Sequence, residues 1–189
     1  MIEATKTGNR EIEITSNTDP CNNDLHREQV QTALCQAGEG EEDKTMEILP
    51  GKGWGQIKFG MRQNAVNQIL GAPDEIENDK EDELAYHHYD ELTLSLTYDG
   101  TEDDRLSTII IADGASTLFG EDLFTLSLDE IKTLLKAQGC KGLSVEGEDE
   151  DKVLEAEELE MIFWFENDEL MEVQWGPFFA DEDQILWPA

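Results

Sequence analysis

Residues 92–98 alternate strictly between apolar and polar side chains. Because successive side chains of a strand point to opposite faces, this alternation predicts a strand with one buried face and one solvated face. Runs of similar length that are rich in apolar or aromatic residues predict further strands at residues 85–89, 106–112, 159–165 and 170–175.

Apolar residues recur at helical spacing in three other segments, which are residues 24–37, residues 61–70 and the stretch after Ser127. The first two segments are followed by Gly38 and Gly71, and glycine is common just after the last helical residue. The third begins with Ser127-Leu-Asp-Glu130, a Ser-x-x-Glu capping box, and ends at Gly139. Three helices are therefore expected.

The order of helix, acidic loop and strands occurs twice after residue 50, with the acidic loops at residues 74–83 and 146–151. We therefore predict an α+β fold of two tandem helix-plus-antiparallel-sheet repeats, with an N-terminal helical appendage. Chance similarity of two α+β halves is the alternative. The expected domains are a partly mobile appendage at 1–50, a first repeat at 51–118, and a second repeat with a C-terminal tail at 119–189.

Acidic residues outnumber basic ones by 45 to 13, which gives a formal net charge of −32. A field of this sign repels nucleic acid and anionic membranes and accelerates the approach of basic partners. We therefore expect a basic protein as the partner, and neither nucleic acid nor a membrane. The alternative is that the charge only keeps the surface solvated.

The residues that usually carry catalysis or bind metals are sparse and badly spaced for either role. His87 and His88 are adjacent in a predicted strand, so they point to opposite faces and cannot bind one metal ion together. The three cysteines, Cys21, Cys35 and Cys140, have no metal-ligand or disulfide spacing, which favours reduced thiols in the cytoplasm. We expect no cofactor, no metal and no enzymatic activity, although the many carboxylates leave a hydrolase open as an alternative.

The first residues and the apolar runs bear on localisation. Residues 1–8 lack the apolar core of a signal peptide. No segment approaches the roughly 20 apolar residues that span a bilayer. A cytoplasmic protein is therefore expected.

Residues 60–74, Gly-Met-Arg-Gln-Asn-Ala-Val-Asn-Gln-Ile-Leu-Gly-Ala-Pro-Asp, combine a Gly-Met turn, a short helix and a Leu-Gly-x-Pro ending, and an aromatic-rich sheet follows. This combination resembles the β-lactamase-inhibitor-protein-like family, which includes lipoproteins of the outer-membrane barrel-assembly machinery and bacterial proteins that serve as immunity proteins beside toxin genes. The resemblance implies a sheet whose concave open face grips a partner. Arg62 stands where the family usually has Ser or Thr, and the signal peptides of the lipoproteins and secreted inhibitors have no counterpart here.

Alternation in the last two strands predicts a binding face. Phe163 and its alternate neighbours would face the helix, as would Met171, Val173 and Trp175, whereas Trp164 would point to the opposite face. An outward Trp among carboxylates is typical of an interface anchor. The expected partner-binding residues are Trp164, Ile162, Glu160, Glu172 and Gln174 on the sheet, with Asp103, Asp104, Glu148 and Asp149 in the acidic loops. Alternatively, the N-terminal segment or the tail at 178–187 covers Trp164.

Three functions follow from these observations. The first is an acidic cytoplasmic immunity or inhibitor protein that occludes the active site of a basic toxin, for example a nuclease. The second is a DNA mimic directed at a DNA-binding enzyme, which regularly spaced carboxylates would favour. The third is a carboxylate-based hydrolase, which requires two close acids of unequal pKa in a pocket.

Overall fold

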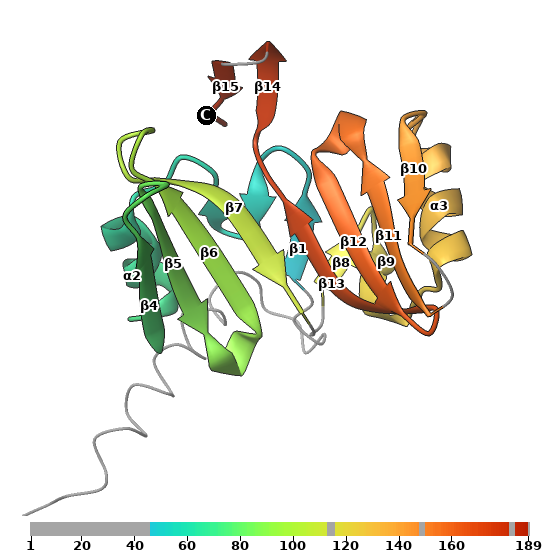
Figure 1. Cartoon of the computed structure of the whole chain (residues 1–189), viewed down its shortest axis with the longest axis horizontal. Coiled ribbons are helices and arrows are strands. Elements are labelled where there is room, and N and C mark those ends of the chain that lie inside the picture. Colours follow the sequence, from blue (N-terminus) through green and yellow to red (C-terminus); the bar gives the residue numbers. More distant parts are fainter. Residues whose placement is uncertain (1–45, 113–115, 148–149, 182–183, 189) are drawn as a thin grey trace, which may run out of the picture.

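The computed structural model describes residues 46–112, 116–147, 150–181 and 184–188. Its largest element is an antiparallel sheet of eight strands in the order β10-β11-β12-β13-β7-β6-β5-β4 (Figure 1). The strands are β4 (Glu75–Asp79), β5 (Leu84–Tyr89), β6 (Leu94–Asp99), β7 (Arg105–Ile111), β10 (Leu143–Glu146), β11 (Asp151–Ala156), β12 (Met161–Glu166) and β13 (Glu169–Trp175). The pairing of β13 with β7 joins the four N-terminal and four C-terminal strands into one sheet.

A second sheet of five short strands has the order β3-β2-β1-β8-β9, and its β1 and β8 run parallel. These strands are β1 (Met46–Leu49), β2 (Gly53–Trp54), β3 (Ile57–Lys58), β8 (Ser116–Leu118) and β9 (Glu121–Asp122). Two indole N–H groups donate hydrogen bonds within this sheet and between the two sheets. The indole of Trp54 donates to Ser116 Oγ at 3.2 Å, and the indole of Trp175 in the large sheet donates to the Gly53 carbonyl at 3.2 Å.

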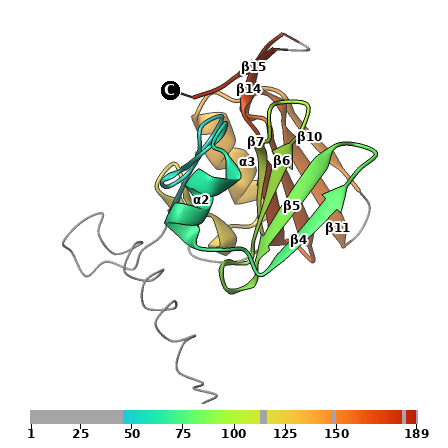
Figure 2. The ribbon, with the colours of Figure 1, turned by 90° about the vertical axis from the view of Figure 1, so that its left-hand side faces the viewer.

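Two α-helices occur among the described residues, and both cover the same face of the large sheet (Figures 1 and 2). They are α2 (Gln63–Leu70) and α3 (Leu128–Ala137), and the short 3-10 helices are η1 (Asp90–Leu92), η2 (Leu123–Thr125) and η3 (Glu157–Leu159). The capping box of α3 is confirmed, because the Ser127 N–H donates to the Glu130 carboxylate at 2.9 Å. No α-helix of the described residues lies on the opposite face of the sheet, which we call the open face (Figure 2).

The core lies between the large sheet and the elements that cover it. Alternate side chains of the central strands point into it, as the strict alternation at residues 92–98 predicted, and Leu94, Leu96 and Tyr98 are buried. The expected inward side chains Phe163 and Val173 are each 0% exposed, which confirms that part of the pattern. Burial of this apolar surface is the dominant favourable term in the stability of the fold.

The predicted fold class is wrong. Strands dominate the described residues, the two α-helices are only eight and ten residues long, and eight of the strands form one continuous antiparallel sheet rather than two helix-plus-sheet repeats. The last residues of the predicted helical appendage at 1–50 also belong to the folded body, since Met46–Leu49 is a strand in which Ile48 is 1% exposed. The helix expected at 24–37 lies outside the described residues.

The acidic segments explain much of this error. Residues 74–83 were expected to form a loop, but they supply the edge strand β4. At the other edge, β10 ends at Glu146 and β11 begins at Asp151, so strands flank the expected loop at 146–151. Backbone pairing does not depend on the side chain, and charged side chains at a sheet edge stay solvated and discourage pairing with other chains.

A β-bulge overturns the predicted direction of Met171. Trp164 pairs with Glu172, whereas Phe165 pairs with Leu170, so Met171 is the extra residue of β13. Its side chain is 45% exposed, while Leu170 takes the buried position. Strict alternation of side-chain direction does not hold across such an extra residue, and the sequence pattern carries no signal for it.

Candidate functional site

A groove opens on the open face where two central strands separate. The strands β7 and β13 are paired only from Ile109–Trp175 to Ile111–Val173. After Trp175 the chain leaves the sheet through Gly176 and Pro177 and enters a hairpin of β14 (Phe178–Asp181) and β15 (Gln184–Leu186), which projects beyond the sheet (Figure 1). The resulting groove has a volume of about 640 Å³.

Four parts of the chain form the groove. Its lining residues are Leu84, Thr97, Asp99, Thr101, Glu102, Ser107 and Thr108 from the N-terminal strands and their turns, Glu155, Glu157, Glu160, Met161, Ile162 and Gln174 from the C-terminal strands and η3, Gly176 and Pro177 at the exit from the sheet, and Phe179 and Ile185 from the hairpin. The volume lies within the roughly 300–1,000 Å³ typical of small-molecule pockets, so it can hold a few residues of a partner but not a whole domain.

Carboxylates approach the groove from two sides. Asp99 is the last residue of β6 and Glu102 lies in the turn to β7, whereas Glu155, Glu157 and Glu160 come from the region around η3. The lining residues that the structure describes include no Lys, Arg or His. A groove with this composition attracts cations and repels anions.

The carboxylates of the lining do not all have the same environment. One carboxylate oxygen of Asp99 accepts hydrogen bonds from the backbone N–H and the hydroxyl of Thr101, at 2.8 and 2.6 Å, which fixes its orientation. Desolvation raises the pKa of Glu160, and the neighbouring charge of Glu157 adds to the effect. The ionised form of Glu160 is therefore one that a bound cation would stabilise.

The hairpin supplies an apolar wall. Phe179 pairs with Ile185, so both side chains lie on one side of the hairpin, and both line the groove. Phe179 is 45% exposed. On the other side of the hairpin, Phe178 pairs with Leu186, which is 48% exposed and does not line the groove.

Contacts at both ends hold the hairpin in position. A Cβ at Gly51 would overlap the ring of Phe178, so only glycine allows this close approach at the start of β14. Beyond β15, the Trp187 ring packs over Gly60, where an added Cβ would lie 3.0 Å from the ring. The Arg105 guanidinium lies 5.4 Å from the centre of the same ring, a cation–π arrangement.

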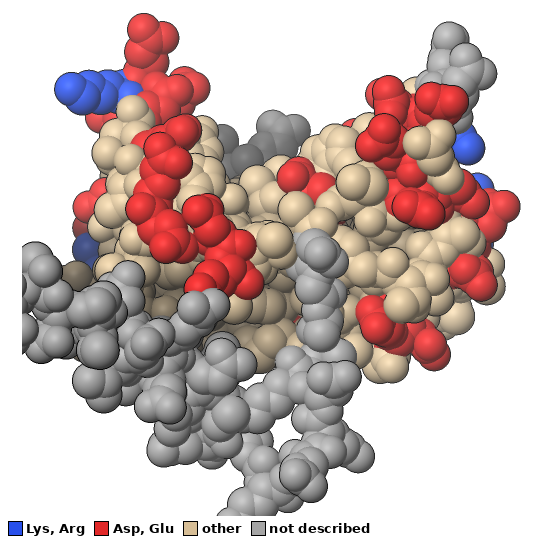
Figure 3. Space-filling view, turned by 90° about the horizontal axis from the view of Figure 1, so that it is seen from below, with Lys and Arg blue, Asp and Glu red and all other residues tan. Residues whose placement is uncertain are grey.

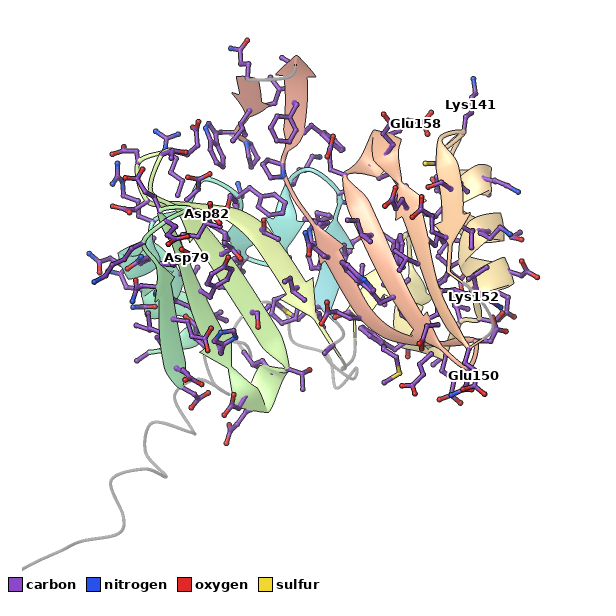
Figure 4. The ribbon with its side chains drawn as sticks, in the orientation of Figure 1. Asp79, Asp82, Lys141, Glu150, Lys152 and Glu158 are labelled. Carbon is purple, nitrogen blue, oxygen red and sulfur yellow. The ribbon has the colours of Figure 1, made fainter. Side chains whose placement is uncertain are left out.

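Other carboxylates near the groove accept hydrogen bonds from backbone N–H groups. The Glu158 carboxylate accepts hydrogen bonds from the backbone N–H groups of Lys141 and Gly142, at 2.6 and 2.9 Å, and the pKa of Glu158 is lowered chiefly by the bond from Gly142. Figure 4 shows Glu158 and Lys141 together at one end of the sheet, with Glu150 and Lys152 at the other end of β11. At the opposite edge, Asp79 accepts the backbone N–H of Asp82 at 3.3 Å.

Seen from below, the side of the molecule that carries the open face is hollowed between two raised flanks (Figure 3). Figure 3 shows Asp and Glu side chains gathered on both flanks, with few Lys or Arg side chains. In Figure 2 the edge strand β4 and the strand β11 extend to the same side, away from α2 and α3. A partner that enters the hollow therefore passes between acidic surfaces.

The structure brings together part of the predicted partner-binding set. Glu160, Ile162 and Gln174 line the groove. Trp164 and Glu172 pair with each other on the same open face but lie outside the groove lining. Both are half-buried, and desolvation raises the pKa of Glu172.

The predicted loop carboxylates do not form part of the groove. Asp103 forms an exposed ion pair with Arg62, the residue that precedes α2 and gives it no side-chain cap. Asp104 is exposed in the same turn and does not line the groove. Glu148 and Asp149 lie outside the described residues.

Several groove residues were missed at the sequence level. Asp99 ends β6 and Glu102 lies in the turn that follows, and nothing in the sequence distinguishes them from the other acidic residues of that segment. Glu155 could have been found by alternation, because β11 pairs with β12 and puts Glu155 opposite Ile162. Phe179 and Ile185 required the hairpin, which no turn signal in the sequence predicted.

The described residues contain no group of three or more His, Cys, Asp or Glu side chains arranged to hold a metal ion. Within the same part of the chain, no helix is long and apolar enough to cross a membrane.

His87 is 1% exposed, and its ring lies 4.7 Å from that of Tyr98. Among the described residues, neither ring nitrogen of His87 nor the hydroxyl of Tyr98 has a hydrogen-bond partner.

No protein-family model matches the chain, and no curated protein sequence matches it. Among solved structures, the chain is similar to an extracellular protein containing a SCP domain from Bacillus anthracis str. Ames, with a TM-score of 0.44 and 11% sequence identity. The similarity covers 75% of this chain and 49% of the other, so this chain spans about half the length of that protein.

Proposed function

We propose that this chain is a cytoplasmic binding protein that neutralises a basic partner by holding part of it in the groove of the open face. The proposal extends to an immunity or inhibitor role in which the bound partner is a toxin, for example a nuclease, whose active site is occluded. The protein acts by binding and not by catalysis.

The single observation that carries the proposal is the composition of the groove. Carboxylates line it from two sides, and none of the described lining residues has a basic side chain. The net charge of −32 extends the same sign of field over the surface, which raises the association rate with basic proteins. Trp164, outside the groove on the same face, gives a larger partner an aromatic surface to cover.

The resemblance of residues 60–74 to a family with immunity-protein members supports the toxin as the class of partner. Small basic nucleases and similar toxins carry clustered Lys and Arg around their active sites, because they bind phosphates. An acid-lined groove competes with the phosphates of the substrate for those Lys and Arg side chains. This competition is the mechanism that we propose for inhibition.

The proposal is tested by capture followed by a growth assay. The wild-type chain, the groove variant Glu157→Gln/Glu160→Gln and the control variant Glu121→Gln/Asp122→Asn are each immobilised and exposed to a lysate of the source organism. The control removes the same charge from exposed residues of β9, in the other sheet. We expect a basic protein that the wild type and the control retain and the groove variant loses.

The captured protein is then expressed alone and together with each variant. The proposal predicts that it arrests growth alone, and that the wild type and the control restore growth while the groove variant does not. If the retained protein is acidic or harmless, or if the groove variant protects as well as the wild type, the proposed function is wrong.

A further inference from the structure

The apolar wall that the hairpin supplies places a requirement on the partner, in addition to positive charge. Phe179 is 45% exposed although it lies beside a groove lined with carboxylates, and its neighbour Ile185 lines the groove as well. An exposed aromatic side chain in a concave site is typical of an anchor that becomes buried on binding. The groove therefore has both a charged wall and an apolar wall.

The apolar wall is fixed before any partner arrives. A two-stranded hairpin alone is marginally stable in water, so its position depends on contacts with the rest of the fold. Phe178 over Gly51 and Trp187 over Gly60 provide these contacts at its two ends. Because the hairpin is held in place, a partner loses little binding energy in ordering it.

We infer that the groove selects a partner segment in which a lysine or arginine is next to an apolar side chain, with the cation against Glu157 and Glu160 and the apolar side chain against Phe179 and Ile185. This inference rests on the proposed function, and it names the chemistry of the segment that the groove accepts. Partners that carry only clustered charge bind more weakly, since they leave Phe179 in water.

Two synthetic peptides of equal charge test the inference. One alternates Lys with Leu, and the other alternates Lys with Ser, so that only the apolar side chains differ. Binding is measured by titration calorimetry at about 0.15 M salt, where the screening length is about 8 Å. We expect the Lys–Leu peptide to bind the wild type about 10-fold more tightly or better.

The chain offers a matched pair of variants on the hairpin. Phe179 and Leu186 are exposed to nearly the same extent, 45% and 48%, but only Phe179 lines the groove. Phe179→Ser should lower the affinity for the Lys–Leu peptide to that of the Lys–Ser peptide and leave the Lys–Ser affinity unchanged. Leu186→Ser should change neither affinity. Thermal melts of both variants confirm that each remains folded.

The outcomes separate the inference from the proposed function. If the two peptides bind the wild type equally, or if Phe179→Ser and Leu186→Ser weaken binding equally, the apolar requirement is overturned, while salt-sensitive binding of both peptides still supports capture of basic partners. If neither peptide binds even at low salt, the inference and the proposed function both fail.

Discussion

The backbone N–H of Gly176 donates a hydrogen bond to the carbonyl oxygen of Glu160, 3.1 Å away. The bond extends the pairing of β12 with β13 one step beyond Trp175, whose partner is Met161. On the other side of β13, the pairing with β7 ends at Trp175. The chain is thus held on one side only at the point where the groove opens, and the carboxylate of Glu160 lines that opening.

Binding of a cationic probe should depend on pH through Glu160. Desolvation and the charge of Glu157 raise the pKa of Glu160 above its ordinary value of 4.5. Because a cation favours the ionised form, affinity for the Lys–Leu peptide should fall as the pH is lowered through this raised pKa. In Glu160→Gln the affinity should be lower at neutral pH and should vary less above about pH 4.5. An unchanged pH profile in that variant would show that Glu160 does not face the bound cation.

The buried imidazole of His87 should make the fold sensitive to mild acid. Burial lowers the pKa of His87 below 6.5, and the charge of His88 contributes further. The unfolded chain therefore takes up a proton before the folded chain does, so the free energy of unfolding should decrease as the pH falls below about 6.5 and level off below the folded pKa.

The variant His87→Leu tests this account of acid sensitivity. It should remove that decrease and raise stability by about 1–3 kcal/mol at mildly acidic pH, because it eliminates a buried polar group without a hydrogen bond. His88→Gln is the control, since His88 lies 2.8 Å from Ser95 Oγ on the open face, and it should keep most of the decrease because burial, the larger cause of the lowered pKa of His87, is unchanged. Urea denaturation at several pH values measures both variants, and equal pH dependence in His87→Leu and the wild type would contradict this account.

Neighbouring side chains of β12 should differ in their contribution to stability. Phe163 is 0% exposed in the core, so Phe163→Ala should cost about 3–5 kcal/mol. Trp164 is half-buried on the open face, where it pairs with Val153 and Glu172. Trp164→Ala should cost distinctly less, because its side chain keeps contact with solvent in the folded state. Thermal melts decide the matter, and a comparable loss in both variants would mean that Trp164 is part of the core.

Anchoring of the hairpin can be measured with two glycines of similar backbone conformation. Gly60 and Gly120 have φ angles of 81° and 84°, so alanine at either position costs about 1–2 kcal/mol of backbone strain. Only at Gly60 would the new Cβ meet another side chain, the Trp187 ring at 3.0 Å. Gly60→Ala should therefore also weaken binding of the Lys–Leu peptide, whereas Gly120→Ala should not. Equal affinities of the two variants would show that the contact with Trp187 does not position the groove wall.

The local elements of the fold could be predicted from the sequence. Alternation and short apolar or aromatic runs found the five central strands, and the capping box at Ser127 found the start of α3, because these signals arise within a few residues. The strands β4, β10 and β11 were missed, since β4 is mostly acidic, β10 and β11 border the expected acidic loop at 146–151, and the pairing of all three is set by backbone contacts with neighbouring strands. Their omission led to the wrong fold class.

The groove was only partly predictable for a related reason. Strand alternation put Ile162 and Gln174 on the correct face, but the groove itself results from the separation of β7 and β13, a relationship between residues about 65 positions apart in the chain. The bulge at Met171 and the packing of Trp187 over Gly60 are likewise long-range features. Short-range patterns in one sequence carry no signal for them.

The most direct test of the central claim compares two variants of equal charge. Glu157→Gln/Glu160→Gln removes two carboxylates from the groove, and Glu121→Gln/Asp122→Asn removes two exposed carboxylates from β9. The affinity of the Lys–Leu peptide is measured by titration calorimetry at about 0.15 M salt, where exposed charges farther away than about 8 Å are largely screened. We predict that the groove variant loses about 10-fold in affinity while the β9 variant stays within about 2-fold of the wild type. Equal losses in the two variants would contradict the claim, because they would show that the peptide responds to net charge and not to the groove.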